Sequence, residues 1–293
     1  MLSPTRLAIA VLMCISFYAI GAYSQKYGIW PLPQLAHMKE QLAGGPMLTD
    51  AMGRLLRYPG KVEIHCPMQD EKTAVLLVIG QSNAANHQGQ RYRGVDSRVV
   101  NFADGKCYLA ESPLLGAEGE YGEPWTLVAN KLVTAGLYNQ VVLIPAGVGS
   151  TPIHRWAAGG DLNRMLIDVI DGAKSRYAIT HVLWHQGETD FGMKTLQASY
   201  KADLSSLIAT VRAVGVFAPF YVSKASFEER YRGRTPVNPI TIAQGELVDG
   251  KTILVGPDTD VTVTALDRFD GTHFSASGQE KFAAAWVSLL QAR

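Results

Sequence analysis

A run of five branched apolar residues, Val75–Ile79, stops at Gly80 and is followed at once by Gln81, Ser82 and Asn83. A short apolar run bounded by glycine predicts a buried central strand. Gly80 permits a sharp turn at the carboxyl end of that strand, which is where open parallel sheets bind their ligands. Taken alone, a serine in this setting more often caps a helix than acts as a nucleophile. The remainder of the chain has to decide between these two interpretations.

Strands and helices alternate along the rest of the chain. Further apolar runs predict strands at 141–145, 181–185, 217–223 and 252–255, with a shorter one at 98–102. Helical periodicity follows Pro124, follows Asp161, runs from Tyr200 to Val211 and begins again at Ser277. Strands that alternate with helices indicate βαβ units, a parallel sheet and helices on both of its faces. The sequence therefore predicts an α/β protein, built as a three-layer α/β/α sandwich.

The N-terminal segment has the features expected of a targeting signal. Arg6 precedes an uncharged apolar run, Leu7–Tyr23, which is near the lower length limit for a membrane-spanning helix. We interpret residues 1–25 as a signal-anchor, with a cleaved signal peptide ending near Ala19–Gly21 as the alternative. Both interpretations predict a membrane-anchored or secreted protein whose body lies outside the cytoplasm, in the periplasm or extracellular space. Membrane contact is then expected through this segment.

Proline-rich residues 26–73 are interpreted as a stalk or N-terminal extension, and residues 74–293 as the main domain. Cys66 and Cys107 form a disulfide if the body is exported, although two free buried cysteines fit the sequence equally well. The net charge of +1 gives no reason to expect a nucleic-acid partner. We also expect no metal, because His65, His87 and His181 lack partners at metal-ligand spacing.

Four polar clusters follow predicted strands or precede the last predicted helix. They read GQSN at 80–83, AGVGST at 146–151, HQGETD at 185–190 and FDGTHF at 269–274. The carboxyl ends of parallel strands meet at one edge of a sheet, so the first three clusters should converge on one crevice. In the fourth, Asp270 lies three residues before His273, a spacing that lets the carboxylate accept the Nδ1 proton. With Ser82, these residues would supply the nucleophile, base and orienting acid of acyl transfer.

These four blocks, in this order over about residues 75–286, resemble the SGNH (GDSL-like) hydrolases. Within them, the chain is similar to the branch that holds sialate O-acetylesterases and plant acetylxylan esterase-like proteins. The resemblance implies a flavodoxin-like sheet of five parallel strands, no cofactor, and Ser82, His273 and Asp270 as the triad. It also implies an oxyanion hole made by the amide of Ser82, a glycine amide and a side-chain amide. We assign these last two to Gly149, with Gly147 as the competitor, and to Gln186.

The substrate-binding residues follow less directly from the pattern. Trp156 suits stacking on a sugar ring and Arg155 suits a carboxylate or phosphate, although Trp156 fits packing against the sheet equally well. Asn83 and Glu188 lie within the active-site blocks and complete this set. For Glu188 and Asp190 we favour bracing of the loop over support of Gln186.

The function expected from these features is a serine esterase that removes O-acetyl groups from carbohydrate. A polysaccharide O-acyltransferase with the same triad is one alternative, because both reactions need the same acyl-enzyme. An inactive carbohydrate-binding protein that kept the fold is the other. The sequence does not identify the sugar.

Overall fold

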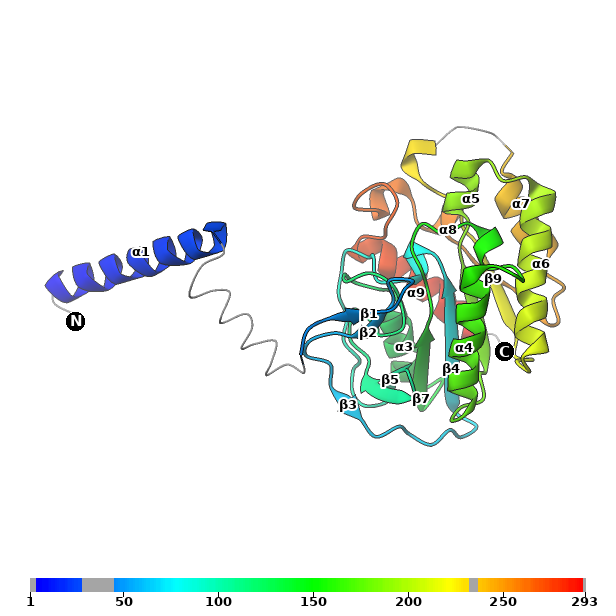
Figure 1. The fold of residues 1–293 in the computed structure, drawn as a ribbon, viewed down its shortest axis with the longest axis horizontal. Helices are drawn as coiled ribbons and strands as arrows, with labels where there is room; N and C mark the ends of the chain where they lie inside the picture. The colour runs from blue at the N-terminus through cyan, green and yellow to red at the C-terminus, as the bar shows by residue number, and fades with distance from the viewer. Residues whose placement is uncertain (1–3, 28–44, 232–236, 292–293) are drawn as a thin grey trace. The chain divides into compact units, whose positions relative to one another are not determined.

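The computed structural model of the chain describes residues 4–27, 45–231 and 237–291 (Figure 1). The chain divides into two units, residues 1–47 with 58–60 and residues 48–57 with 61–293. In the first unit, Pro4–Tyr27 form helix α1. A membrane span needs roughly 20 consecutive, predominantly apolar residues, and no helix within the described ranges is both long and apolar enough to qualify. The membrane-spanning signal-anchor expected at residues 1–25 is therefore not supported.

The domain boundaries drawn from the sequence stay predictions. Of the predicted extension, residues 28–44 lie outside the described residues. Residues 48–57 and 61–73 belong to the same unit as the main sheet. There β1 (Leu48–Thr49) and β2 (Leu55–Arg57) form a small antiparallel sheet of their own.

The main sheet has eight strands in the described part of the chain, in the order β10-β9-β8-β4-β7-β5-β6-β3. Their bounds are β3 (Glu63–Ile64), β4 (Thr73–Gly80), β5 (Val99–Ala103), β6 (Lys106–Leu109), β7 (Gln140–Pro145), β8 (His181–His185), β9 (Phe220–Lys224) and β10 (Ile253–Asp258). The five predicted strands pair in parallel in the order β7-β4-β8-β9-β10. Numbered along the chain this is 2-1-3-4-5, the flavodoxin-like order. The predicted fold class is confirmed.

The sheet is wider than predicted on one side. Beyond β7 it continues with β5, which is parallel to β7, and then with the antiparallel strands β6 and β3. A tight turn joins β5 to β6 at Asp104 and Gly105, which have positive φ values of 50° and 74°. Two consecutive residues with positive φ are typical of the turns that match the twist of a hairpin. The expected short strand at 98–102 is thus the start of a hairpin that extends the sheet.

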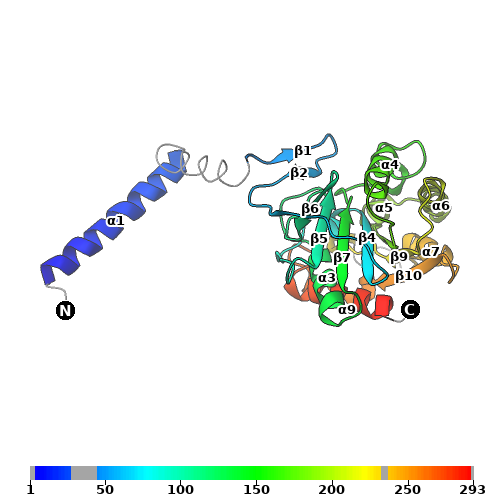
Figure 2. The ribbon, with the colours of Figure 1, turned by 90° about the horizontal axis from the view of Figure 1, so that it is seen from below.

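Helices cover both faces of the sheet, as the view in Figure 2 shows. Helices α3 (Trp125–Thr134) and α9 (Ala276–Gln291) lie on one face, and α4 (Asp161–Lys174), α6 (Gln197–Ala213) and α7 (Pro239–Glu246) on the other. Shorter elements are the helices α5 (Glu188–Met193) and α8 (Thr259–Thr262) and the 3₁₀ turns η1 (Ser82–Ala84), η2 (Ile153–Arg155), η3 (Glu229–Tyr231) and η4 (Ala265–Asp267).

Central strand β4 shows why both faces need a cover. Its alternate residues Ala74, Leu76 and Val78 pack toward α3 and α9, and the residues between them pack toward α4 and α6. Every residue of β4 is buried. Because side chains alternate across a strand, a continuous apolar run is stable only when both faces of the sheet are covered.

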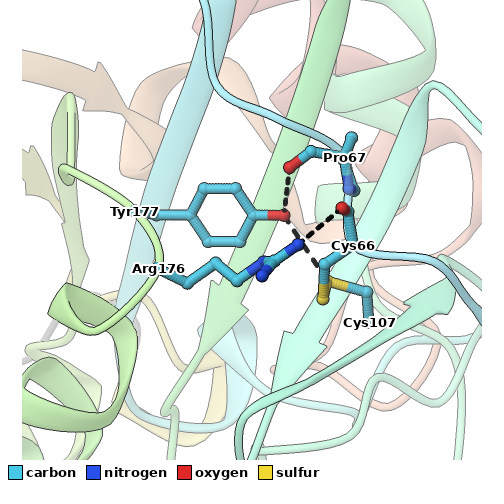
Figure 3. The surroundings of a disulfide bond; sticks show 5 residues. All are labelled: Cys66, Pro67, Cys107, Arg176 and Tyr177. Atoms are coloured by element: carbon cyan, nitrogen blue, oxygen red, sulfur yellow. Dashed lines mark hydrogen bonds between the residues drawn. A yellow bond between two sulfur atoms is a disulfide. The ribbon is translucent and has the colours of Figure 1, made fainter.

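A disulfide joins Cys66 to Cys107 and so links the segment after β3 to β6 (Figure 3). Around it, the hydroxyl of Tyr177 donates to the carbonyl oxygen of Pro67 at 3.0 Å, and Arg176 donates to the carbonyl oxygen of Cys66 at 2.9 Å. The structure therefore selects the disulfide from the two possibilities that the sequence left open. The disulfide stabilises the edge strand β3, which has only two residues to pair with β6.

Removing this disulfide should cost much of the stability of the domain. The cross-link closes a loop with a sequence separation of 41 residues, for which the loss of unfolded-state entropy predicts about 4 kcal/mol. We expect Cys66→Ala/Cys107→Ala to lower the free energy of unfolding, measured by urea denaturation, by about that amount. The wild-type protein in reductant should match the variant. A loss below about 1 kcal/mol in both would contradict a structural role for the cross-link.

Candidate active site

The serine block forms a tight turn at the carboxyl end of β4. Gly80 has a φ of +137°, and a Cβ atom there would lie only 2.0 Å from the carbonyl oxygen of His185 on β8. Glycine is therefore required at this position. The amide of Gln81 donates to the same carbonyl at 3.1 Å. Ser82 then begins η1 and is 5% exposed. The close approach of β4 and β8 thus holds the serine just beyond the carboxyl end of β4.

The predicted base and acid lie together on a turn before α9. Asp270 Oδ2 lies 2.7 Å from His273 Nδ1, and Asp270 Oδ1 accepts the amides of Thr272 and His273 at 2.9 and 2.7 Å. Gly271, with a φ of +84°, allows the chain to turn between them. Burial acts to raise the pKa of Asp270, but the hydrogen bonds from His273 and the two amides outweigh it and hold that pKa below its usual value. The carboxylate is therefore ionised at neutral pH and orients the imidazole.

Ser82 and His273 line the same cleft, which has a volume of about 380 Å³. The other residues of its wall are Gln81, Ser150, Thr189, Gly192, Met193, Glu228, Arg230, Tyr231 and Thr272. The contacts of the described residues do not include a hydrogen bond between Ser82 Oγ and His273 Nε2. Catalytic contacts are often longer in unliganded proteins than in the working complex. The arrangement brings nucleophile and base into one cleft, and the link between their side chains stays a prediction.

A second imidazole–carboxylate pair stands beside the first. The His87 ring stacks on His273 with centroids 5.6 Å apart and planes at 23°, and His87 Nε2 lies 2.5 Å from Glu118 Oε2. Phe269 also stacks on His273, at 6.1 Å. Neither Glu118 nor a partner for His87 was predicted from the sequence. No local signal could have revealed this pair, because its members are 31 residues apart in the sequence.

Two of the predicted oxyanion-hole donors are occupied. The amide of Gly149 donates to Glu118 Oε2 at 2.9 Å. Gln186 is fully buried, and its Nε2 donates to the Thr151 carbonyl at 2.9 Å and to Asp190 Oδ2 at 2.5 Å. Both protons of that amide are thus used inside the protein. The assignment of Gln186 to the oxyanion hole is wrong in this arrangement, and its amide instead braces the loop after β8.

Ser150, the residue after Gly149 in the second block, belongs to the wall of the cleft. Ser150 lines the cleft with Ser82, whereas Gly149 and Gly147 do not. Ser150 has a φ of +55°, a conformation that costs free energy for a residue other than glycine. Gly147 packs against the backbone of the serine turn, since a Cβ atom there would lie 2.9 Å from the Ala84 carbonyl oxygen. The loop therefore packs against Ala84 of the serine turn at Gly147 and reaches the cleft wall at Ser150.

Two predicted substrate residues belong elsewhere. Trp156 is fully buried, contacts Trp184 edge-on with centroids 5.5 Å apart, and donates its indole proton to Thr151 Oγ1 at 3.0 Å. It cannot stack on a sugar, so the core packing that the sequence also allowed is the correct interpretation. Arg155 pairs with Asp161 at 2.6 Å and is not part of the cleft wall. Its assignment to the substrate stays a prediction, and its surface ion pair with Asp161 gives that assignment no support.

Asn83 and Glu188 form a buried contact under the cleft. Asn83 Nδ2 donates to Glu188 Oε1 at 2.7 Å and to the carbonyl of Thr272 at 3.3 Å. Asn83 is fully buried and Glu188 is 2% exposed, so burial keeps both of these predicted substrate residues away from a ligand in the cleft. Their contacts instead connect the serine turn to the loop after β8 and to the turn that carries His273.

Asp190 both braces the loop after β8 and supports Gln186. Its Oδ2 accepts the amide of Ile153 at 2.8 Å in addition to Gln186 Nε2. Both roles weighed for Asp190 are therefore present, bracing of the loop and support of Gln186.

Within the described ranges, no group of three or more His, Cys, Asp or Glu side chains could hold a metal ion.

Comparison with known proteins identifies related folds and one family. Residues 72–288 match the family described as "Carbohydrate esterase, sialic acid-specific acetylesterase". The sequence matches no curated protein.

Three solved structures show the likeness of the fold. A protein of Arabidopsis thaliana is 17% identical, with a TM-score of 0.60 over 76% of this chain and 98% of that chain. NanS is 13% identical, with a TM-score of 0.54 over 77% of this chain and 98% of its own. A catalytic mutant of Axe2, an acetylxylan esterase from Geobacillus stearothermophilus, is 14% identical, with a TM-score of 0.50 over 74% and 94%.

Proposed function

Because the chain belongs to the carbohydrate esterase family of sialic acid-specific acetylesterases, we propose that it removes O-acetyl groups from sugars with Ser82, His273 and Asp270. The family makes the protein a carboxylic ester hydrolase, and the residues that perform the reaction are our proposal. One observation carries it. The imidazole that Asp270 holds at 2.7 Å lies on the wall of the cleft that also contains Ser82. A nucleophile, a base and an orienting carboxylate are the groups that acyl transfer requires.

In this proposal, Ser82 Oγ attacks the acetyl carbonyl carbon while His273 Nε2 takes the hydroxyl proton. Asp270 stabilises the imidazolium that forms. The negative oxygen of the tetrahedral intermediate is bound by the amide of Ser82 and by the amide of Ser150, which replaces Gly149 in this role. His273 then protonates the departing sugar oxygen. In the second half-reaction it activates a water that releases acetate from Ser82.

The cleft has the polar character that a sugar substrate needs. Its wall carries the ion pair of Glu228 and Arg230, together with Thr189 and Tyr231. The ring of Tyr231 packs on Gly192 of α5, where a Cβ atom would lie only 2.5 Å from Tyr231 Cε2. An aromatic ring beside hydrogen-bonding groups can bind the apolar face and the hydroxyls of a pyranose. We propose that the sugar lies against Tyr231, with its acetyl group toward Ser82.

The disulfide supports a location outside the cytoplasm. Structural disulfides persist in oxidising compartments and are rare in reducing ones. The Cys66–Cys107 bond therefore supports the proposal that this domain folds after export.

The proposal is tested by measuring acetate release from a panel of O-acetylated sugars. We expect mass spectrometry to show a loss of acetyl groups from sialates or from xylan-type oligosaccharides, and hydrolysis of p-nitrophenyl acetate by the same protein. A parallel reaction contains a non-acetylated acceptor sugar. Acetate in solution supports the esterase, and acetylated acceptor in its place would show a transferase instead. Folded protein that releases no acetyl group from any substrate, and that a fluorophosphonate probe does not label at Ser82, would refute the proposal.

A further inference from the structure

The side chain of Gln88 contacts both segments that carry the proposed triad. Gln88 follows η1 and is 1% exposed. Its Nε2 donates to the carbonyl of Ser82 at 3.3 Å and to Asn83 Oδ1 at 3.1 Å. Its Oε1 accepts the amide of Phe274, the residue after His273, at 2.6 Å. One amide group therefore connects the nucleophile turn to the base turn, which is 186 residues away in the sequence from Gln88.

The backbone around Gln88 is itself fixed. The amide of Gln88 donates to the carbonyl of Gly122 at 2.8 Å, and the amide of Gly122 donates back at 2.9 Å. The next residue, Gly89, donates its amide to the carbonyl of Phe274 at 2.9 Å. Both backbone groups of Phe274 are thus held by residues 88 and 89. The preceding residue on the same segment, His87, stacks on the ring of His273.

We propose that Gln88 is a positioning residue that sets the distance and orientation between Ser82 Oγ and His273 Nε2. This inference rests on the proposed function and adds a residue to it. The side-chain amide has one acceptor and two donor protons, and all of them are directed to the two turns. A carboxylate of the same length keeps the acceptor and loses both donors, and methionine fills similar space with neither. A displacement of about 1 Å between reacting groups can reduce a rate on the order of 100-fold.

The chain offers a matched control in Gln279 of α9. This glutamine is also fully buried. Its Oε1 accepts the amide of Gln90 at 2.9 Å, and its Nε2 donates to the carbonyls of Gln90 and Glu123 at 2.9 and 3.2 Å. It therefore makes the same number of side-chain hydrogen bonds as Gln88, one accepted and two donated, but none to the turns of Ser82 or His273. A purely structural role for Gln88 predicts similar effects of the two substitutions on activity.

The test compares Gln88→Met with Gln279→Met in the full chain. We expect both variants to lose thermal stability. Only Gln88→Met should lower kcat for p-nitrophenyl acetate, on the order of 100-fold, with KM changed much less. It should also slow fluorophosphonate labelling of Ser82, because labelling needs Ser82 Oγ and His273 Nε2 at the correct distance and orientation. If Gln88→Met does not fold, Gln88→Glu replaces it, with the same direction of change expected.

Two results would overturn this inference by itself. One is an active, labelled wild type whose folded Gln88 variant keeps the wild-type kcat and labelling rate. The other is an equal loss of kcat in the Gln88 and Gln279 variants, which would show general destabilisation. A wild-type protein that neither hydrolyses acetyl esters nor reacts with the probe would instead refute the proposed function, and the inference with it.

Discussion

Ser82→Ala is expected to lower kcat for p-nitrophenyl acetate by roughly 10⁴- to 10⁶-fold while the protein stays folded. The expected loss is large because the acyl-enzyme forms on Ser82 Oγ, and the remaining groups only polarise the ester. Folding should be preserved, since Ser82 lines the cleft and no hydrogen bond found between the described residues uses its hydroxyl. Steady-state kinetics and the melting temperature, measured on the same preparation, check both statements.

The control for this prediction is Ser205→Ala. Ser205 is exposed on α6, and its hydroxyl donates to the carbonyl of Lys201, so its loss should leave kcat at the wild-type value. A Ser82→Ala protein that keeps more than about a tenth of wild-type kcat would contradict covalent catalysis by Ser82.

Asp270→Asn is expected to lower kcat on the order of 10³- to 10⁴-fold, again without unfolding. Asparagine can still accept the amides of Thr272 and His273 through its oxygen. Its NH₂ group would then face His273 Nδ1, which favours the tautomer with the proton on Nε2. An imidazole protonated on Nε2 cannot accept the proton of Ser82.

The pH dependence of stability provides a second measurement on the same variant. The folded pKa of Asp270 is lowered, because the hydrogen bonds from His273 and the two amides outweigh burial. The contribution of Asp270 to stability is therefore complete above its unfolded pKa and is lost as pH falls through the folded pKa. Asp270→Asn should remove that part of the acid dependence.

The matched control for the loss of kcat is Asp249→Asn, because Asp249 also accepts the amides of its own turn, at 2.7–2.8 Å from Lys251, Thr252 and Ile253. Since Asp249 is not part of the cleft wall, a comparable loss of kcat in this control would contradict the role given to Asp270.

The elements of the fold were largely predictable because their signals are local. The apolar run of β4 and the helical spacing of α4 and α6 each lie within one short segment, and short-range sterics and burial decide them. The additional strands β3 and β6 were not predicted, because they are short and their pairing depends on partners distant in the sequence.

The residues of the candidate site likewise fall into those that local sequence predicted and those that it did not. Asp270 and His273 are three residues apart, so one turn joins them, and the sequence identified that pair. The sequence left Trp156 open between the cleft and the core, and it could not show the partners of Gln186, because neither exposure nor distant hydrogen bonding is a local property. A tryptophan can face a cleft or the core, and only the packing of α4 and α6 over the sheet buried this one.

By itself, the sequence determined the five strands of the parallel core and the long helices beside them, where the polar clusters follow, and that Asp270 lies within reach of His273. These features depend on neighbours in the chain. Only the tertiary structure paired the carboxylate of Glu118 with the amide of Gly149 and the amide of Gln186 with Asp190. It also joined the turns of Ser82 and His273 through Gln88. The physical reason is that a buried polar group must find its hydrogen-bond partner in space. In this protein those partners lie 31 residues away for Gly149 and 186 residues away for Gln88.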